Sequence, residues 1–225
     1  MDQSRPIRSF VKRQRKLSNE KQVIFDELWS KYVLDLSTEY PYSCCTHLTL
    51  EIGFGNGETI FNLAQKYPER SFIGIEVYQP GIANLLSLLK KQPLNNIRIY
   101  YGDAVTVLDK CFLDYTLDII LILFPDPWPK TRHHKRRLIQ QKFIELLQKK
   151  LKPTGILKII TDLEDYAKHI IKVLSKNQNF KALDQLESLP MMYDQCAQTK
   201  FGQRGKIKGH QIFELLFATS GSCKL

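Results

Sequence analysis

The chain has 225 residues, of which 43% are hydrophobic and 25% are charged, and its net charge at pH 7 is +10. The length predicts one domain with short extensions, and the composition excludes a largely disordered chain. Because no apolar run approaches about 18 residues and the N-terminus lacks an apolar signal region, we expect neither a membrane span nor secretion. Five cysteines, an odd number without CxxC spacing, indicate reduced thiols in the cytoplasm and no metal site.

The positive charge is concentrated in three blocks, while the rest of the chain is net acidic. Residues 1–16 hold six Lys and Arg against one Asp, residues 130–137 hold five with no acid, and residues 198–210 hold four with no acid. Such blocks are typical of a surface that binds a polyanion, although each alone is more often a solvated face. We expect residues 1–17 to form a mobile basic arm and residues 18–225 to form a single folded domain.

A helix is predicted first, because Ser18 can cap the apolar residues that recur at three- and four-residue spacing as far as Tyr32. After a loop over residues 36–47, short apolar runs alternate with helical patterns. Strands are predicted over residues 48–52, 71–76, 97–101, 117–123, 155–161, 180–184 and 212–217, and helices over residues 58–67, 79–89, 104–108, 137–151 and 163–175. This alternation predicts a doubly wound α/β domain whose parallel sheet is covered on both faces.

The strongest local signal is a glycine-rich turn between the first of these strands and the next helix, with the pattern E-x-G-x-G-x-G at Glu51, Gly53, Gly55 and Gly57. Glycines allow a sharp turn and let a ligand approach the backbone closely. The dinucleotide pattern GxGxxG is not completed, because Glu58 stands at its last position. An acid two residues before the first glycine also suits a cationic ligand better than a pyrophosphate.

Two further carboxylates follow the next two strands. Glu76 ends the second strand, where an acid can accept both ribose hydroxyls, and Asp103 follows the third, where an adenine amino group could be held. Each acid alone could equally be a helix cap. Three acids at this spacing, with no Lys or Arg in the loop, describe a pocket for a cationic adenosine derivative. S-adenosylmethionine is the predicted cofactor, with S-adenosylhomocysteine as its product.

The fourth strand ends in Pro125-Asp126-Pro127-Trp128, and the basic segment KTRHHKRR comes directly after it. The two prolines stiffen this corner, which fixes a carboxylate and an aromatic ring at the carboxyl end of the sheet, where ligands bind. A rigid turn with Trp128 in the core is the alternative interpretation, but it does not account for the basic residues.

These motifs closely resemble those of the bacterial tRNA (guanine-N7)-methyltransferases, a family of class I S-adenosylmethionine-dependent enzymes. The resemblance extends over nearly the whole chain, through RSFVKRQ, EIGFGNG, FIGIE, GDA, PDPWPKTRHHKRRL, Thr161-Asp162, TKF and Arg204-Gly205. The PDPWPKxRHxKRR stretch is highly specific, whereas the glycine-rich loop is common to class I methyltransferases. The fold implied is a Rossmann-like α/β domain with about seven strands, the last of them antiparallel, extended by an N-terminal helix and the basic arm.

The resemblance also implies a set of site residues, with Asp126 as the catalytic one. The implied cofactor contacts are Glu51, Gly53, Gly55, Gly57, Glu76, Asp103, Ala104 and Asp126. The implied substrate contacts are Lys130, Asp162, Thr199, Lys200, Phe201 and Gly202. The implied RNA contacts are Arg132, His133, His134, Lys135, Arg136, Arg137 and Arg204. The family usually has Glu where this chain has Gly202, so another acceptor is expected there, with Asp162 or Glu164 as candidates.

The implied reaction is methyl transfer to N7 of a tRNA guanine, the variable-loop guanine at position 46. Guanine N7 is a lone-pair acceptor that carries no proton, so no general base is needed and catalysis would rest on positioning and electrostatics. A carboxylate such as Asp126 or Asp162 can accept from guanine N1–H and the 2-amino group. The sequence leaves open how these two acids divide the roles, and whether the protein is a monomer or a homodimer.

Two other functions fit parts of the sequence. A methyltransferase for small molecules or exocyclic amines would be favoured by an Asp/Asn-Pro-Pro-Tyr/Trp motif, but here the prolines flank Asp126 and the basic blocks would have no purpose. An RNA-binding subunit that has lost catalysis would be marked by an eroded glycine loop or by missing acids at the strand ends. Neither mark is seen, apart from Gly202.

Overall fold

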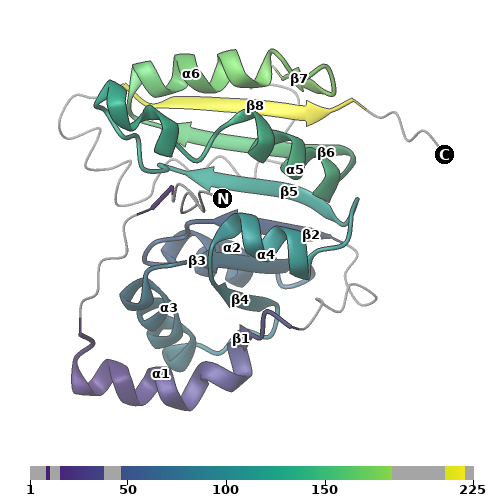
Figure 1. The fold of residues 1–225 in the computed structure, drawn as a ribbon. Helices are drawn as coiled ribbons and strands as arrows, with labels where there is room; N and C mark the ends of the chain where they lie inside the picture. The colour runs from purple at the N-terminus through teal and green to yellow at the C-terminus, as the bar shows by residue number, and fades with distance from the viewer. Residues whose placement is uncertain (1–8, 11–15, 38–46, 184–210, 221–225) are drawn as a thin grey trace, which may run out of the picture.

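Seven short apolar runs of the sequence form strands where the pattern predicts them. The computed structural model describes residues 9–10, 16–37, 47–183 and 211–220. Within these ranges the chain forms one sheet from the strands β1 Val33–Leu34, β2 Leu48–Ile52, β3 Ser71–Glu76, β4 Ile97–Tyr101, β5 Leu117–Leu123, β6 Leu151–Thr161, β7 Phe180–Ala182 and β8 Phe213–Thr219. The strand order is β1-β4-β3-β2-β5-β6-β8-β7 (Figure 1).

The sheet is mostly parallel, and the antiparallel last strand predicted from the sequence is confirmed. The pairs from β1 to β6 along the sheet are parallel, whereas β8 runs antiparallel to both β6 and β7. The strand order reverses between β2 and β5, which are neighbours. In an open α/β sheet such a reversal leaves a crevice at the carboxyl ends of the strands, where ligands bind.

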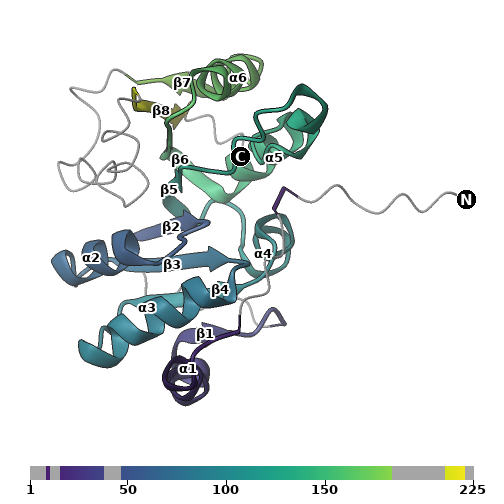
Figure 2. The same cartoon turned by 90° about the vertical axis from the view of Figure 1, so that its left-hand side faces the viewer.

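Helices cover both faces of the sheet, as a doubly wound fold requires (Figure 2). The helices are α1 Asn19–Tyr32, α2 Glu58–Lys66, α3 Gln79–Lys91, α4 Ala104–Cys111, α5 Gln141–Lys150 and α6 Glu164–Leu174, with a 3-10 helix, η2, over Thr131–Arg136. Buried side chains of α4, α5 and α6 share one hydrophobic core, and those of α1, α2 and α3 share the other. The apolar stripe of each helix is thus buried against the sheet.

Some elements differ from their predictions. The strand β6 begins at Leu151 instead of residue 155, α4 ends at Cys111 instead of residue 108, and η2 was not predicted. The strand β1 is additional: it pairs Val33 with Ile99 at the sheet edge and, with two residues, is too short to produce a periodic pattern. The helix predicted over residues 137–151 begins only at Gln141. The preceding residues are held extended because the Ile139 carbonyl contacts His169 Nε2 at 2.8 Å and the Ile139 amide donates to the Tyr166 hydroxyl at 3.4 Å.

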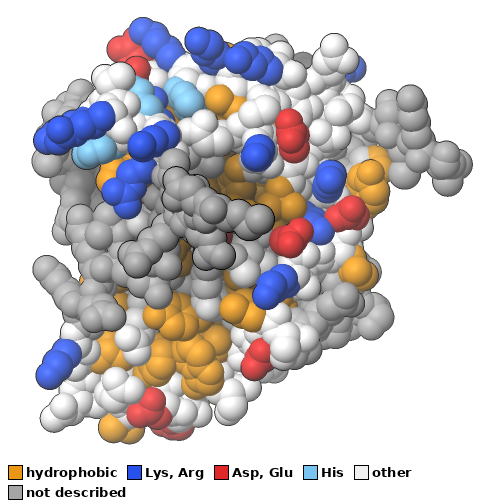
Figure 3. Space-filling model, in the orientation of Figure 1, with side chains coloured by type: hydrophobic (Ala, Val, Ile, Leu, Met, Phe, Trp, Pro, Cys, Tyr) orange, Lys and Arg blue, Asp and Glu red, His pale blue; other side chains and the backbone are white. Residues whose placement is uncertain are grey.

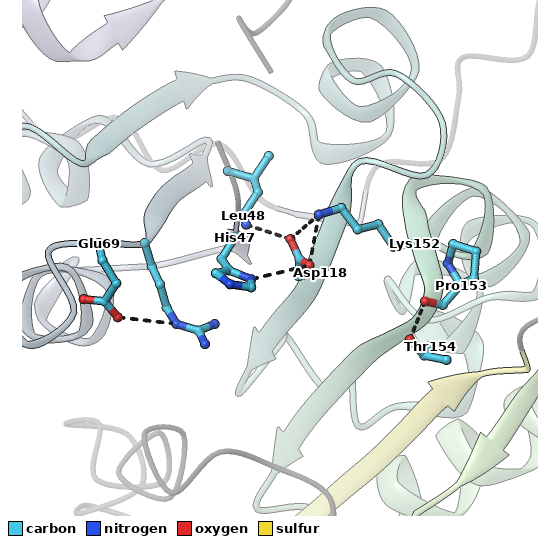
Figure 4. Close-up of polar contacts among 8 residues, drawn as sticks. His47, Leu48, Glu69, Asp118, Lys152, Pro153 and Thr154 are labelled. Carbon is cyan, nitrogen blue, oxygen red and sulfur yellow. Dashed lines mark hydrogen bonds and ion pairs between the residues drawn. The ribbon is translucent and has the colours of Figure 1, made fainter. Parts of the chain in front are cut away.

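The end of the sheet opposite the ligand crevice is tied together by Asp118, near the start of β5 (Figure 4). Its carboxylate accepts from the backbone amide of Leu48 at 2.8 Å and from Lys152 Nζ at 2.8 and 3.0 Å, and His47 lies 3.9 Å away. One side chain therefore joins the beginnings of β2, β5 and β6. This fixes the register of the three central strands whose other ends carry the site.

Candidate functional site: a cofactor cleft beside a basic loop

The glycine-rich turn leads from β2 into α2 through backbone conformations that favour glycine. Gly53, Gly55 and Gly57 have φ angles of +72°, +57° and +76°. A Cβ atom on Gly57 would lie 2.7 Å from the Cβ of Leu85 in α3, so the turn also needs glycine for its packing. The loop therefore presents bare backbone to the cleft, as a ligand in close approach requires.

Glu51 is a buried carboxylate in the floor of this turn. It is 2% exposed, and its Oε2 has no hydrogen-bond partner among the described residues. Burial, and then the neighbouring Glu76, raise the pKa of Glu51 to about 8. Because an unpaired buried carboxylate is unfavourable, Glu51 fits a ligand that brings a positive charge or a donor, as the amino group of S-adenosylmethionine does.

Glu76 ends β3 and is 7% exposed. Its Oε2 accepts from the Gly55 amide at 2.7 Å, and its Oε1 accepts from the amides of Val77 and Tyr78 at 2.7 and 2.9 Å. Burial raises the pKa of Glu76 in spite of these bonds. The carboxylate thus pins the glycine loop against β3, a structural task that the sequence did not predict, while it also lines the cleft.

Glu76, Asp103 and Asp126 come together along one cleft of about 520 Å³, as the strand-end pattern predicts. Asp103 also caps α4 by accepting from the Thr106 amide at 3.2 Å, so the helix-cap interpretation of this acid is correct as well. Ala104 lies beside it. Glu51 opens into an adjoining pocket that shares Gly53 with the cleft. Among the residues that the structure describes, the charged side chains that line the cleft and the adjoining pocket are all acidic, which fits a cationic adenosine derivative.

The Pro125–Trp128 corner stands at the end of β5, above this cleft. Asp126 is exposed there, and its charge contributes to the raised pKa of Glu76. Phe124 and Trp128, on either side, have φ angles of +51° and +44°. Such values are unfavourable for residues with side chains, so the surrounding contacts must hold the corner in this shape.

Trp128 is held by three contacts and is not part of either hydrophobic core. Its indole Nε1 donates to the Ser9 carbonyl at 3.0 Å. The Arg136 guanidinium lies 4.1 Å from the ring centroid, and the His133 ring meets the indole edge-on at 5.8 Å. Ser9 and Phe10, the described part of the basic arm before Lys16, line the cleft.

The basic segment after the corner forms the 3-10 helix η2 and part of a positively charged surface. Lys, Arg and His side chains gather at the upper left of Figure 3, where the connection between β5 and α5 lies in Figure 1. Lys130, Arg132 and Lys135 are exposed, whereas His133, His134 and Arg136 are partly buried. Partial burial and the neighbouring cations Arg132, Lys130, Arg136 and Lys135 lower the pKa of His133, so it is neutral at pH 7.

Arg137 differs from the other predicted RNA contacts because it is buried, with 2% of its surface exposed. Its Nε donates to the Pro127 carbonyl at 3.0 Å, its Nη2 pairs with the Asp165 carboxylate, and its guanidinium lies 4.8 Å from the centroid of the Tyr166 ring. The sequence did not single out Asp165 or Tyr166. An acid in the first turn of a helix is ordinary, and no pattern links it to a residue 28 positions earlier.

Asp162 lies between the end of β6 and the start of α6, partly buried. The remaining predicted site residues, Thr199, Lys200, Phe201, Gly202 and Arg204, lie outside the described residues. Within the described ranges no group of three or more His, Cys, Asp or Glu side chains could hold a metal ion. Among the helices seen there, none has the length and apolar character to span a membrane.

Comparison with known proteins identifies the family of the chain. Residues 46–215 match the family model described as "Putative methyltransferase". The tRNA (guanine-N(7)-)-methyltransferase of Nitrosococcus oceani is 44% identical over 97% of this chain and 93% of its own length. That of Nitrosomonas europaea is also 44% identical, over 94% of this chain and 96% of its own length.

Among solved structures, similarity is confined to the fold. The 16S rRNA methyltransferase KamB superposes with a TM-score of 0.55 at 12% identity, covering 93% of this chain and 97% of its own. A SAM-dependent methyltransferase from Aquifex aeolicus gives a TM-score of 0.52 at 16% identity, covering 79% and 85%. The fold is that of the class I methyltransferases, and the chain belongs to the family of S-adenosylmethionine-dependent tRNA (guanine-N7)-methyltransferases.

Proposed function

We propose that this enzyme methylates N7 of the variable-loop guanine at position 46 of tRNA, and that it does so in the cytoplasm. The observation that supports the proposal is the juxtaposition of an acidic cleft, lined by Glu76, Asp103 and Asp126, with the exposed cations Lys130, Arg132 and Lys135. The cleft suits a cationic cofactor, whereas the cations suit a polynucleotide backbone.

The residues assigned to the cofactor are Glu51, Gly53, Gly55, Gly57, Glu76, Asp103, Ala104 and Asp126. When bound, S-adenosylmethionine supplies a methyl group on a sulfonium. Glu51 holds the amino group of the cofactor, because its Oε2 is buried and has no partner within the part of the chain that the structure describes. Glu76 and Asp103 hold the ribose and the adenine, and the glycine turn lets the cofactor lie against the backbone.

Asp126 and Asp162 are assigned to the guanine. Asp126 projects at the end of β5 over the cleft, and Asp162 follows the neighbouring strand β6. A carboxylate that accepts from guanine N1–H and the 2-amino group selects guanine over adenine and stabilises the positive charge that develops on the purine. N7 carries no proton, so neither acid has to act as a base.

The tRNA backbone is assigned to the basic segment. Lys130, Arg132 and Lys135 offer exposed cations to phosphates, and His133, His134 and Arg136 line the same segment. The substrate residues Thr199, Lys200, Phe201 and Gly202, and Arg204 beside them, complete the assignment on the sequence resemblance alone. Phosphate contacts offset the cost of freeing a guanine from tRNA tertiary structure, roughly a few kcal/mol.

Site mapping tests the proposed position. Unmodified tRNA is methylated with the enzyme, reduced with borohydride and treated with aniline, which cleaves the chain at 7-methylguanosine. We expect one cleavage, at position 46, and no methylation of a tRNA that carries adenine there. Cleavage at another guanine, or undiminished methylation of the adenine variant, would contradict the proposal.

A further inference from the structure

Arg137 carries a buried charge within an exposed basic segment. Its side chain is 1% exposed, whereas those of Arg132 and Lys135 in the same segment are exposed. A guanidinium is buried only when its donors are satisfied, and here Nε bonds to the Pro127 carbonyl and Nη2 to the Asp165 carboxylate. A phosphate on the molecular surface has no access to these donors.

These contacts join the two segments that carry the guanine-binding acids. Pro127 directly follows Asp126, and Asp165 stands in the first turn of α6, three residues after Asp162. The Arg137 guanidinium also stacks on Tyr166, the next residue of α6, whose side chain is fully buried in the core. The loop after β5 is therefore fixed to a helix that is itself firmly packed.

The corner needs such support because of its backbone. Phe124 and Trp128 both have positive φ angles, and a residue with a side chain keeps such a conformation only when its surroundings impose it. Pro127, whose carbonyl accepts the hydrogen bond from Arg137, lies between Phe124 and Trp128 in the sequence. A lysine could not replace it, since an ammonium lacks the planar fork that reaches a carbonyl and a carboxylate together.

We propose that Arg137 is a positioning residue for methyl transfer, not an RNA ligand: it fixes the Asp126 corner relative to α6 and Asp162. The proposal rests on the proposed role of Asp126. It assigns phosphate binding to the exposed cations of the segment and gives Arg137 a separate task. Asp165 is the necessary partner, and the hydrogen bond from Arg137 is the main cause of its lowered pKa.

The two roles differ in what salt does to tRNA binding. Loss of one phosphate contact lowers the slope of log K against log salt concentration by about one, whereas loss of a positioning contact leaves that slope unchanged. A positioning contact acts instead on the rate at saturating tRNA, because the reacting groups are no longer aligned.

The test compares Arg137→Lys with Arg132→Gln, an exposed neighbour in the same segment. We expect Arg137→Lys to lower the single-turnover rate at saturating tRNA by roughly 10- to 100-fold. We expect Arg137→Gln, which removes the charge, to leave the salt slope unchanged. We expect Arg132→Gln to weaken tRNA binding and to reduce the slope by about one. A rate for Arg137→Lys within twofold of wild type, or a salt slope reduced by Arg137→Gln as it is by Arg132→Gln, would overturn the proposal.

Asp165→Asn provides a second test in which the substituted side chain is itself exposed, since Asp165 is 63% exposed. It should lower the rate as Arg137→Lys does. The double variant should be no slower than the slower single one, because both substitutions disrupt the same ion pair. Additive losses, or a normal rate for Asp165→Asn, would contradict the coupling. This variant decides the matter if Arg137→Lys does not fold. If wild-type enzyme itself leaves tRNA unmethylated, the proposed function fails instead.

Discussion

Glu51 is a residue whose proposed role in cofactor binding lowers the stability of the ligand-free fold. Its carboxyl group is buried beside Glu76, and its pKa is raised to about 8. A raised pKa means that the folded, ligand-free protein holds this proton more tightly than the unfolded chain does. Ionising Glu51 therefore destabilises the ligand-free fold until a cation enters the cleft.

Glu51→Gln should show separately how the ionisation of Glu51 affects stability and how it affects cofactor binding. Wild-type stability should fall as the pH rises from the ordinary pKa of Glu51 towards about 8, and the variant should lack this fall. The free energy of unfolding of the variant relative to wild type should therefore grow by up to roughly 4 kcal/mol across this pH range. Urea denaturation of the ligand-free proteins at pH 5 and pH 8.5 measures it.

The same variant should bind S-adenosylmethionine more weakly, and the gap should widen by up to about tenfold per pH unit as wild-type Glu51 ionises. Titration calorimetry of both proteins across pH 6–8.5 checks this. Protonation of the ligand itself affects both proteins equally and cancels in the comparison. Equal affinities throughout would remove Glu51 from the cofactor site.

At the scale of elements, the sheet is stabilised at the end away from the cleft by the bonds of Asp118. Its side chain is 25% exposed and accepts hydrogen bonds from the Leu48 amide and the Lys152 ammonium. Without Asp118 the Leu48 amide would lose its partner at the start of β2. This network is distant from the chemistry, so it should affect stability alone.

Asp118→Ala should lower the free energy of unfolding by about 2 kcal/mol and leave the rate of methyl transfer unchanged. Lys168→Ala is the matched control, because it breaks an exposed pair with Glu164 within one helix and should cost no more than about 0.5 kcal/mol. Chemical denaturation of the three proteins measures the difference. Equal losses in the two variants would show that the Asp118 network adds nothing.

The elements that the sequence predicts best are those with a strong local pattern. The strands β2 to β5 are short apolar runs bounded by turns. The glycine turn was predictable because its φ angles are ones that glycine adopts readily. The predicted start of α5 was wrong, because tertiary contacts with Tyr166 and His169 keep Ile139 extended. Such bonds leave no trace in periodicity.

The candidate site was predictable to the same extent. Strand ends placed Glu76, Asp103 and Asp126 in one cleft, because parallel strands bring their carboxyl ends to one edge. The burial of Arg137 was not predictable, since in the sequence it continues a run of exposed cations. Its partner Asp165 comes from a different element and is recognised only in three dimensions.

At the scale of the whole molecule, charge of opposite sign is separated along the strand ends. The acids lie within the cleft. The exposed cations lie on the loop that leaves β5 beside it, and Lys and Arg side chains gather in that region at the upper left of Figure 3. A net charge of +10 alone would favour binding of any polyanion. Under the proposed function, the separation would direct the anionic RNA to the loop and the cationic cofactor to the cleft.

Methyl transfer from labelled S-adenosylmethionine to unmodified tRNA, followed by nucleoside analysis, tests the central claim most directly. The account predicts that the label appears in 7-methylguanosine, and that Asp126→Ala lowers kcat by at least about 10²-fold while the protein remains folded. Label in another nucleoside, no label in tRNA, or near-normal turnover by Asp126→Ala would contradict it.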